Sequence, residues 1–330
     1  MRQLQTFGAF IIACAGISLA SSIVVPFLLA VFLSVAIAPL MAVMMKYHVP
    51  RAISMLIVFA IFGYIFYLFG SIIASTGASL AHDMPMYKER FEGVINTSLA
   101  WLEAHELNTN IDILIKDNIE RVFSSATALF KGTSEIVTKS FLVLLLMVFM
   151  IFEAPIFAKK IENFGGSASL VMHNFANNLK RYVLIKTISS IGTALILLPA
   201  LWYFDVPYAM FLALLAFGLN YIPTVGSTIA AIPAILLCLL TGEPVNTLWL
   251  GIYYIIINIA IGNFIEPKFL GQGLGISTLV VVLSLIFWGF LLGIGGMFLA
   301  VPLTMSIKLA LDESKNFKFI AILLSDKAQK

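Results

Sequence analysis

The stretch that decides the fold reads PYAMFLALLAFGLNYIP at residues 207–223 and continues as TVGSTIAAIPAILLCLLTG at residues 224–242. It is apolar almost throughout, yet it exceeds the length of about 20 residues that one membrane-spanning helix needs. Pro223 and Gly226 interrupt it in the middle, and Pro233 lies further on. The pattern predicts a broken helix or a re-entrant helix pair, because unwound backbone at membrane depth must be covered by protein or line a water-filled cavity.

The composition indicates a helical protein whose surface lies mostly in lipid. Of the 330 residues, 61% are apolar and 11% are charged, and the mean hydropathy is +1.02. A soluble domain carries about 25% charged residues. The net charge of +3 is dispersed and forms no basic stripe of the kind that nucleic-acid binding needs. We therefore predict an all-α polytopic membrane protein whose surroundings are the lipid bilayer, with no nucleic acid as partner.

Hydropathy predicts eight spans and one polar insert. The spans are residues 7–22, 25–45, 52–75, 139–157, 184–204, 207–241, 246–263 and 279–309. Apolar residues recur at helical spacing within the insert, which predicts a small extramembrane lobe of helices. The chain then divides into first transmembrane helices (1–75), an extracytoplasmic helical lobe (76–138), a transmembrane transport core (139–311) and a cytoplasmic tail (312–330).

The basic residues of the short loops predict the orientation of the chain in the membrane. With the N-terminus in the cytoplasm, nearly all lysines and arginines of short loops fall on the cytoplasmic side, as the positive-inside rule requires. We therefore predict that both termini are cytoplasmic. A full crossing by residues 207–241 suits this arrangement, although the sequence leaves open whether the segment crosses or re-enters.

Two places combine helix breakers with polar groups, and they are the candidate binding or gating site. The first holds Asn220, Tyr221, Pro223, Thr224, Gly226 and Ser227, and the second holds Asn263, Glu266, Pro267 and Gly271. Paired interruptions of apolar segments are the best sequence indication of a transporter's binding site. The uncharged donors and acceptors would be Asn220, Thr224, Ser227, Asn258 and Asn263, and the apolar walls Tyr221, Phe264 and Trp288.

Two charged residues allow more than one interpretation. Glu266, between spans seven and eight, is either a solvated loop charge or a carboxylate that gates the site or couples it to an ion. Lys186, at the start of span five, is either an interfacial lysine that extends to the membrane surface or a cation that faces a cavity. An ionisable group inside the membrane costs about 2.5–3.5 kcal/mol on insertion scales, so the second interpretation of each implies a function.

Enzyme and cofactor motifs are missing from the sequence. Residues 271–275 are rich in glycine but lack the G-x-G-x-x-G spacing, and no G-x-x-x-x-G-K-[ST] loop or H-E-x-x-H pair occurs. Cys14 and Cys238 lie inside apolar runs and are interpreted as small buried side chains. We therefore expect no enzyme activity, no cofactor and no metal.

Long blocks of this sequence resemble the autoinducer-2 exporter family of bacterial membrane proteins. The blocks are YVLIKT (182–187), AFGLNYIPTVGSTIAAIP (216–233), GNFIEPKFLGQGLGISTLVVVLSL (262–285) and GIGGMFLAVPLT (293–304). The resemblance implies a permease of the bacterial inner membrane that forms a homo-oligomer and exports autoinducer-2. The residues that it carries over are Asn220, Pro223, Gly226, Asn263, Glu266, Pro267, Gly271 and, less securely, Lys186.

Three functions follow as hypotheses. The first is a secondary transporter that exports autoinducer-2 or a similar small polar metabolite, driven by a solute or ion gradient. The second is a sodium/proton antiporter in which Glu266 binds the coupling ion, proton or sodium. The third is a membrane scaffold whose external lobe binds a partner.

Overall fold

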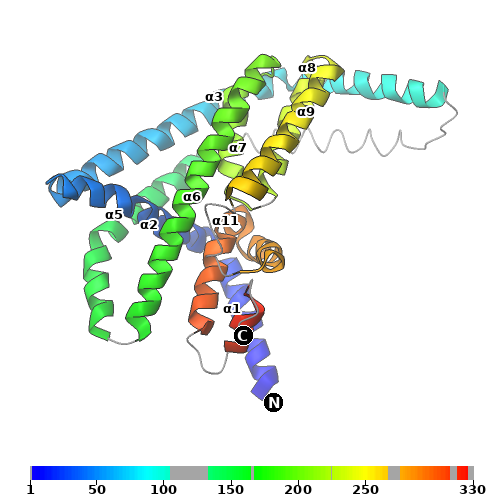
Figure 1. Ribbon diagram of the computed structural model, residues 1–330. Helices are drawn as coiled ribbons and strands as arrows, with labels where there is room; N and C mark the ends of the chain where they lie inside the picture. The colour runs from blue at the N-terminus through cyan, green and yellow to red at the C-terminus, as the bar shows by residue number, and fades with distance from the viewer. Residues whose placement is uncertain are drawn as a thin grey trace.

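The structure is a computed structural model that describes residues 2–104, 133–164, 167–223, 225–266, 276–312 and 318–325. Every regular element within these ranges is a helix, which confirms the predicted all-α class (Figure 1). In chain order the helices are α1 (Arg2–Leu19), α2 (Ser21–Lys46), α3 (Arg51–Ala104), α5 (Thr133–Phe164), α6 (Ser167–Tyr203), α7 (Ala209–Leu219), α8 (Gly226–Thr241), α9 (Pro244–Ile259), the π-helix η1 (Ala260–Ile265), α11 (Thr278–Asp312) and α12 (Lys318–Leu323).

Six described helices are long and apolar enough to cross a membrane. These spans are Ser21–Lys46, Arg51–Leu80, Ser140–Phe157, Met172–Tyr203, Pro244–Gly262 and Thr278–Asp312. Large apolar side chains such as Phe290 and Trp249 stay exposed on them, as expected for surfaces that face lipid. The helix α3 continues past the predicted end of span three into the insert, and residues 105–132 of the predicted lobe lie outside the described residues.

The long apolar stretch folds back as a hairpin of α7 and α8, here called hairpin A (Ala209–Thr241). The hydroxyl of Tyr208, just before α7, is hydrogen-bonded to Asp83 on α3 at 2.5 Å. Arg90, also on α3, donates to the carbonyl of Leu240 near the end of α8 at 3.0 Å. Asp83 and Arg90 are two turns apart, or about 10 Å. Both outer ends of hairpin A therefore lie at the same level, so the segment re-enters, which is one of the two alternatives that the sequence leaves open.

The last predicted span also folds back, at Gly293, and its arms form hairpin B (residues 278–292 and 294–312). Gly293 has φ +65° and ψ −150°, a conformation that glycine adopts far more readily than other residues. The indole of Trp288 donates to the hydroxyl of Thr304 at 3.0 Å. In a straight helix these residues would lie about 24 Å apart. The span expected as one helix is therefore two helices joined by a sharp bend.

The tips of hairpins A and B meet inside the molecule. The ring of Tyr221, at the tip of hairpin A, stacks on Phe298 of hairpin B with a centroid distance of 4.7 Å and an interplanar angle of 21°. Ile222 is buried against Leu285 and Ala300, one from each arm of hairpin B. A movement of one tip must therefore disturb the packing of the other.

The two hairpins open toward opposite ends of the molecule. The backbone N–H of Ser277, at the start of hairpin B, donates to the carbonyl of Leu324, so the open end of hairpin B lies beside the C-terminal segment. Figure 1 shows the C-terminus at the lower end and the outer ends of α7 and α8 at the upper end. Each hairpin enters and leaves on its own side, so neither of the predicted spans 207–241 and 279–309 crosses the membrane. The predicted topology therefore loses two crossings, and both termini still lie at the same end of the molecule.

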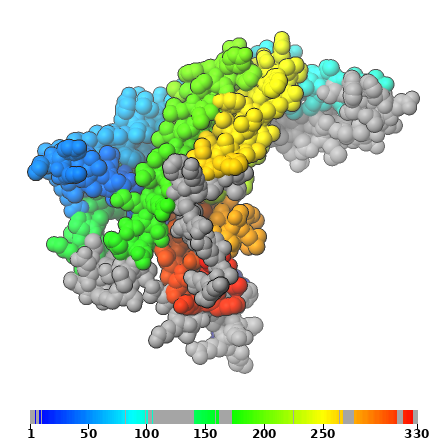
Figure 2. All heavy atoms as spheres, in the orientation of Figure 1, coloured from blue at the N-terminus to red at the C-terminus, as the bar shows by residue number. Residues whose placement is uncertain are grey.

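The helices α6 and α9 bring the charged residues of the site to the tip of hairpin A. They pack against each other and lie side by side on the face shown in Figure 2. Hairpin A packs against both of them, since α7 contacts α6 and α8 contacts α9. Its core, which includes Leu197, Leu212, Ala234 and Tyr254, is buried among α3, α6, α7, α8 and α9.

The contact between α3 and hairpin A yields a first prediction. The turn before α7 holds Asp205 and Tyr208 at φ +50° and +59°, where residues other than glycine are uncommon, and the bond from Tyr208 to Asp83 holds this turn in place. We expect Asp83→Ala to lower the free energy of unfolding by about 1 kcal/mol, measured as a lower unfolding temperature in detergent. Glu89→Ala, at an exposed position of α3, is the control and should unfold like the wild type. Equal unfolding temperatures for all three proteins would contradict the assigned role.

Candidate functional site

A row of polar side chains runs along one face of α6, and all of them are buried. The row consists of Tyr182, Lys186, Ser189, Ser190 and Thr193, none of which is more than 7% exposed. Residues three and four apart lie above one another on a helix, so the row is continuous over about three turns. Polar and ionisable groups inside membrane helices are costly and mark functional sites.

The centre of the site is a buried ion pair between Lys186 and Glu266. The ammonium nitrogen of Lys186 lies 2.8 Å from each carboxylate oxygen of Glu266. Ser189 donates a further hydrogen bond to Oε1 of the same carboxylate, also at 2.8 Å. Only 3% of Lys186 and 9% of Glu266 is exposed. The interpretations of Glu266 as a solvated loop charge and of Lys186 as an interfacial lysine are therefore wrong.

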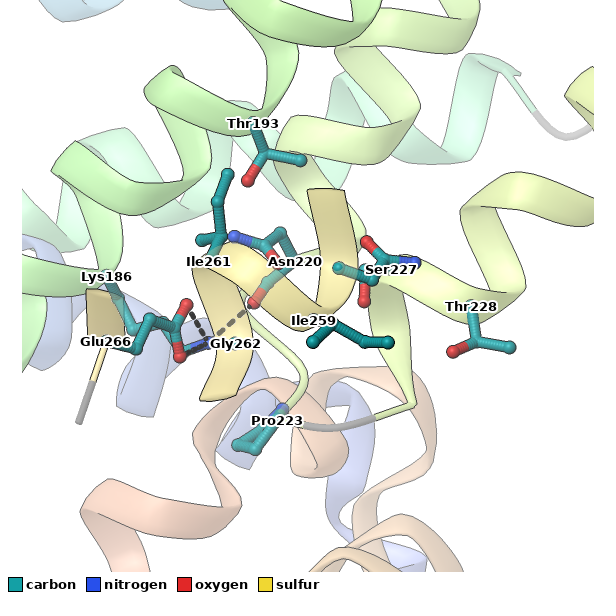
Figure 3. A pocket seen from close by; sticks show the side chains of 11 residues that line it. Lys186, Thr193, Asn220, Pro223, Ser227, Thr228, Ile259, Ile261, Gly262 and Glu266 are labelled. Carbon is teal, nitrogen blue, oxygen red and sulfur yellow. Dashed lines mark hydrogen bonds and ion pairs between the residues drawn. The ribbon is translucent and has the colours of Figure 1, made fainter. Parts of the chain in front are cut away.

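A π-helical turn positions Glu266. The turn η1 continues α9 without a break, and Glu266 is the residue that follows it. Wide turns of this kind are rare and occur frequently at functional sites. Figure 3 shows the carboxylate of Glu266 at the end of this turn, directed toward Lys186 on α6.

The tip of hairpin A is fastened to the same face of α6. Lys186 donates to the backbone carbonyl of Asn220 at 2.9 Å, and the side-chain amide of Asn220 donates to Ser190 at 3.1 Å. The hydroxyl of Thr187, the residue after Lys186, shares a hydrogen bond of 2.7 Å with the hydroxyl of Tyr221. Lys186 thus joins three elements, because α6 carries it, hairpin A offers it a carbonyl and η1 offers it a carboxylate.

A cavity of about 260 Å³ lies beside the ion pair. It is lined by Lys186, Thr193, Asn220, Pro223, Ser227, Thr228, Asn258, Ile259, Ile261, Gly262 and Glu266 (Figure 3). Its polar groups are amides, hydroxyls and one ion pair, and its remaining walls are apolar. Within the described residues no three histidine, cysteine, aspartate or glutamate side chains gather where a metal ion could bind. The cavity is suited to bind a small molecule through several directed hydrogen bonds.

The structure brings half of the predicted site residues together around this cavity. Lys186, Asn220, Pro223, Ser227, Asn258 and Glu266 line it. Tyr221 and Gly226 lie at the tip of hairpin A outside the lining, where they hold the turn in place. Thr224, Pro267, Gly271 and the side chain of Asn263 lie outside the described residues. No role in binding is tested by this placement, so each of these roles stays a prediction.

The expected aromatic walls are elsewhere. The side chain of Phe264 is 70% exposed, and Trp288 packs at the tips of the hairpins. Ile259 and Ile261, which α9 and η1 supply, replace them as apolar lining. Phe264 lies within η1, whose wider turn changes the direction of its side chain relative to an α-helix, whereas Trp288 belongs to hairpin B, which does not line the cavity.

Four polar residues of the site were not predicted. Thr193 and Thr228 line the cavity, and Ser189 and Ser190 hydrogen-bond to Glu266 and Asn220. A signal for those on α6 was present, since Ser189, Ser190 and Thr193 follow Lys186 at intervals that place them on its face of a helix.

These features define a class of protein. Multiple membrane helices surround two opposed hairpins, and a small polar cavity lies between the tip of hairpin A, α6 and the π-helical end of α9. This is the arrangement of a solute transporter, in which discontinuous helices form the binding site.

Comparison with known proteins names the family. The chain matches the AI-2E family transporter over residues 7–316, and it belongs to this family of bacterial transporters. It is 36% identical to the AI-2 transport protein TqsA of Escherichia coli K12, over 97% of this chain and 94% of that protein. A putative transport protein of Haemophilus influenzae is also 36% identical, over 98% and 96%. Putative transport protein YrrI of Bacillus subtilis is 24% identical, over 87% and 85%. The protein is thus a multi-pass membrane transporter.

Proposed function

We propose that this transporter exports a small, uncharged, hydroxyl-rich solute, autoinducer-2 or a similar metabolite, across the bacterial inner membrane. The relative TqsA, which is named for AI-2 transport, supports the substrate class. The observation that carries the proposal is the chemistry of the cavity beside the Lys186–Glu266 pair. It offers amide and hydroxyl groups for several hydrogen bonds, and its volume of about 260 Å³ suits a small metabolite.

The ion pair supports an uncharged substrate. Lys186 and Glu266 neutralise each other at 2.8 Å, so among the described residues the cavity lining offers no free cation to balance an anionic solute. A carboxylate or phosphate buried there would lack a counter-charge, and an uncompensated buried charge is strongly destabilising. The pair can still bind a hydroxyl or carbonyl, because the ammonium group donates and the carboxylate accepts.

In the proposed mechanism, the solute loosens hairpin A. Lys186 bonds to the carbonyl of Asn220 at the hairpin tip, and a solute oxygen in the cavity competes for the same ammonium group. Loss of that bond frees the tip and exposes the cavity to one side, which is the binding step of an alternating-access cycle. The lack of a nucleotide-binding motif in the sequence leaves the gradient of the solute or of an ion as the driving force.

Orientation and assembly complete the proposal. Both chain ends lie at one end of the molecule, and the positive-inside count supports a cytoplasmic position for that end. Hairpin A then opens toward the outside and hairpin B toward the cytoplasm. The homo-oligomer that the family resemblance implies remains part of the proposal.

The test is flux of labelled autoinducer-2 in proteoliposomes that contain the purified protein. We expect saturable flux in the wild type and at least a tenfold loss in Asn220→Ala, since the change removes a cavity donor and the bond to Ser190. A tenfold loss corresponds to about 1.4 kcal/mol. The control is Asn246→Ala, which removes an amide at the start of α9, away from this cavity. Equal flux in all three proteins would place the binding site elsewhere.

The same vesicles test the charge of the substrate. We expect phosphorylated autoinducer-2 neither to be transported nor to compete, because Lys186 already has a partner. Competition by the phosphorylated form with an affinity equal to that of the neutral one would contradict the proposal.

Cation exchange is the second candidate, and one observation favours it. Glu266 is a carboxylate buried in the membrane region, and such groups bind protons or ions in other transporters. The antiporter would be favoured by three results together. A sodium gradient would drive proton flux in the wild type, Glu266→Gln would abolish that flux, and the wild type would transport no autoinducer-2.

A further inference from the structure

The polar groups around the cavity fall into two sets, and the first set is already hydrogen-bonded. Lys186 bonds to the carboxylate of Glu266 and to the backbone carbonyl of Asn220. The side-chain amide of Asn220 donates to a serine hydroxyl on α6, and the hydroxyl of Thr193 donates to the carbonyl of Ser189. These groups are therefore engaged with one another before any solute binds.

The second set has no such partners. It consists of Ser227 and Thr228 in the first turn of α8 and Asn258 in the last turn of α9, and all three line the cavity. Within the described part of the chain, none of these three side chains forms a hydrogen bond. Ser227 and Asn258 are half-buried and Thr228 is exposed, whereas Lys186 and Glu266 are buried. Figure 3 shows Ser227 and Thr228 at the opposite end of the cavity from the ion pair. The cavity is thus closed at the ion pair and open at the free groups.

The three free side chains share one chemical property, since each can both donate and accept a hydrogen bond. A serine or threonine hydroxyl donates once and accepts twice, and an asparagine amide presents a carbonyl oxygen beside an NH₂ group. Two adjacent hydroxyls of a solute satisfy both atoms of the Asn258 amide, because one donates to Oδ1 and the other accepts from Nδ2. A solute with only carbonyl or ether oxygens would leave Oδ1 without a donor, and an unpaired polar group weakens binding.

We propose that Ser227, Thr228 and Asn258 are the specificity-determining residues of this transporter and recognise a pair of adjacent hydroxyl groups on the solute. The other end of the solute carries an acceptor oxygen, which meets the ammonium group of Lys186 while its ion pair with Glu266 stays intact. The solute then lies along the cavity, with its hydroxyls between α8 and α9 and its acceptor at α6. This inference rests on the proposed function, of which it names the substrate class more narrowly.

This orientation of the solute also transfers hairpin A from one neighbour to another. The arm α8 packs against α9, and the free groups of the cavity come from these two helices. A solute that bonds to both joins hairpin A to α9 when Lys186 gives up the carbonyl of Asn220. The second arm of the hairpin therefore stays attached while its tip moves.

The first test is the concentration dependence of autoinducer-2 flux in proteoliposomes. Thr228→Val keeps the shape of the side chain and removes its hydroxyl, and Asn258→Ala removes the amide. Both should raise the half-saturating concentration at least tenfold and leave the maximal flux within twofold of the wild type. Thr228→Ser, which keeps a hydroxyl, is the matched control and should stay within twofold in both quantities. Unchanged half-saturation in Thr228→Val and Asn258→Ala, or an equal loss in Thr228→Ser and Thr228→Val, would overturn the proposal.

The second test changes the solute in place of the protein. A deoxy analogue of autoinducer-2, with one of two adjacent hydroxyls replaced by hydrogen, should compete for wild-type flux at least tenfold more weakly than autoinducer-2 itself. In the double variant of Thr228→Val and Asn258→Ala, the two compounds should compete within threefold of each other, because groups in contact show such coupling. A loss by the same factor in both proteins would overturn the proposal.

A third measurement separates this inference from the identity of the solute. If the wild type neither binds nor transports autoinducer-2, the probe is erythritol, a small polyol with adjacent hydroxyls, and the readout is thermal unfolding in detergent. Bound ligand stabilises the folded protein, so erythritol should raise the unfolding temperature of the wild type more than that of the double variant. Stabilisation by exclusion of a polyol from the surface is the same in both. A larger rise in the wild type supports the hydroxyl site and contradicts only the named solute, whereas equal rises overturn the inference.

Discussion

Replacing either Lys186 or Glu266 alone with methionine is expected to destabilise the protein severely, whereas replacing both should restore stability without restoring transport. Each single change leaves one charge buried at a position that is less than a tenth exposed. Removing one partner of a buried pair costs about 3–5 kcal/mol, while replacing both by apolar residues is often neutral or stabilising. The double variant therefore separates the role of the pair in folding from its role in function.

The measurement combines thermal unfolding in detergent with flux in proteoliposomes. We expect both single variants to unfold at clearly lower temperature than the wild type and the double variant to recover most of the difference. Flux should be lost in all three variants, because the bond from Lys186 to Asn220 is absent or the carboxylate is missing. A double variant that transports like the wild type would reduce the pair to a structural element.

The control for this experiment is the ion pair of Lys308 and Asp312, four residues apart on α11. Its side chains are 13% and 30% exposed, against 4% and 11% for Lys186 and Glu266, and a helical pair of this spacing contributes only about 0.3–0.5 kcal/mol at a surface. Lys308→Met should therefore unfold and transport nearly like the wild type. The contrast between the two lysines tests whether burial, and not charge as such, makes Lys186 indispensable.

The class of fold could be predicted from the sequence because composition and hydropathy are properties of the whole chain and do not depend on which helices contact each other. Helix breakers also located the first hairpin, since Pro223 and Gly226 stand in the middle of an apolar stretch too long for one span. The second hairpin was missed. Gly293 lies within an apolar run that reads as one span by hydropathy, and only its φ of +65° and the contact between Trp288 and Thr304 reveal the bend.

The ion pair could not be predicted from local pattern. Lys186 and Glu266 are 80 residues apart in the chain, and hydropathy contains no information on which helix faces which. A π-helical turn also rotates the residues after α9 relative to an α-helix, so the direction of Glu266 depends on a feature with no clear sequence signal. The interpretation of each residue as functional followed from its cost in a membrane, whereas their pairing required the structure.

Substituting alanine for Gly226 is expected to abolish transport by opening the tip of hairpin A. A Cβ atom at this position would lie 1.8 Å from the carbonyl oxygen of Leu219 and 2.6 Å from its carbonyl carbon. Both contacts are with backbone, so no side-chain rotation can relieve them. The Leu219 carbonyl accepts the bond from Ile222 that closes the turn, and the next residue, Asn220, provides the carbonyl that Lys186 binds. Displacing the Leu219 carbonyl therefore also displaces the Asn220 carbonyl.

Gly218 provides a matched control within the same hairpin. A Cβ atom there would meet nothing within 4 Å, and alanine is favoured over glycine inside a helix by about 1 kcal/mol. Gly218→Ala should therefore transport normally and unfold at the same or a higher temperature, while Gly226→Ala should lose at least tenfold in flux and unfold at a lower temperature. Gly296→Ala should resemble Gly226→Ala, since its Cβ would lie 2.0 Å from the carbonyl oxygen of Trp288 in hairpin B. Normal flux in Gly226→Ala would mean that the tip of hairpin A tolerates rearrangement, and the assignment of Asn220 and Lys186 as the link that the solute breaks would then fail.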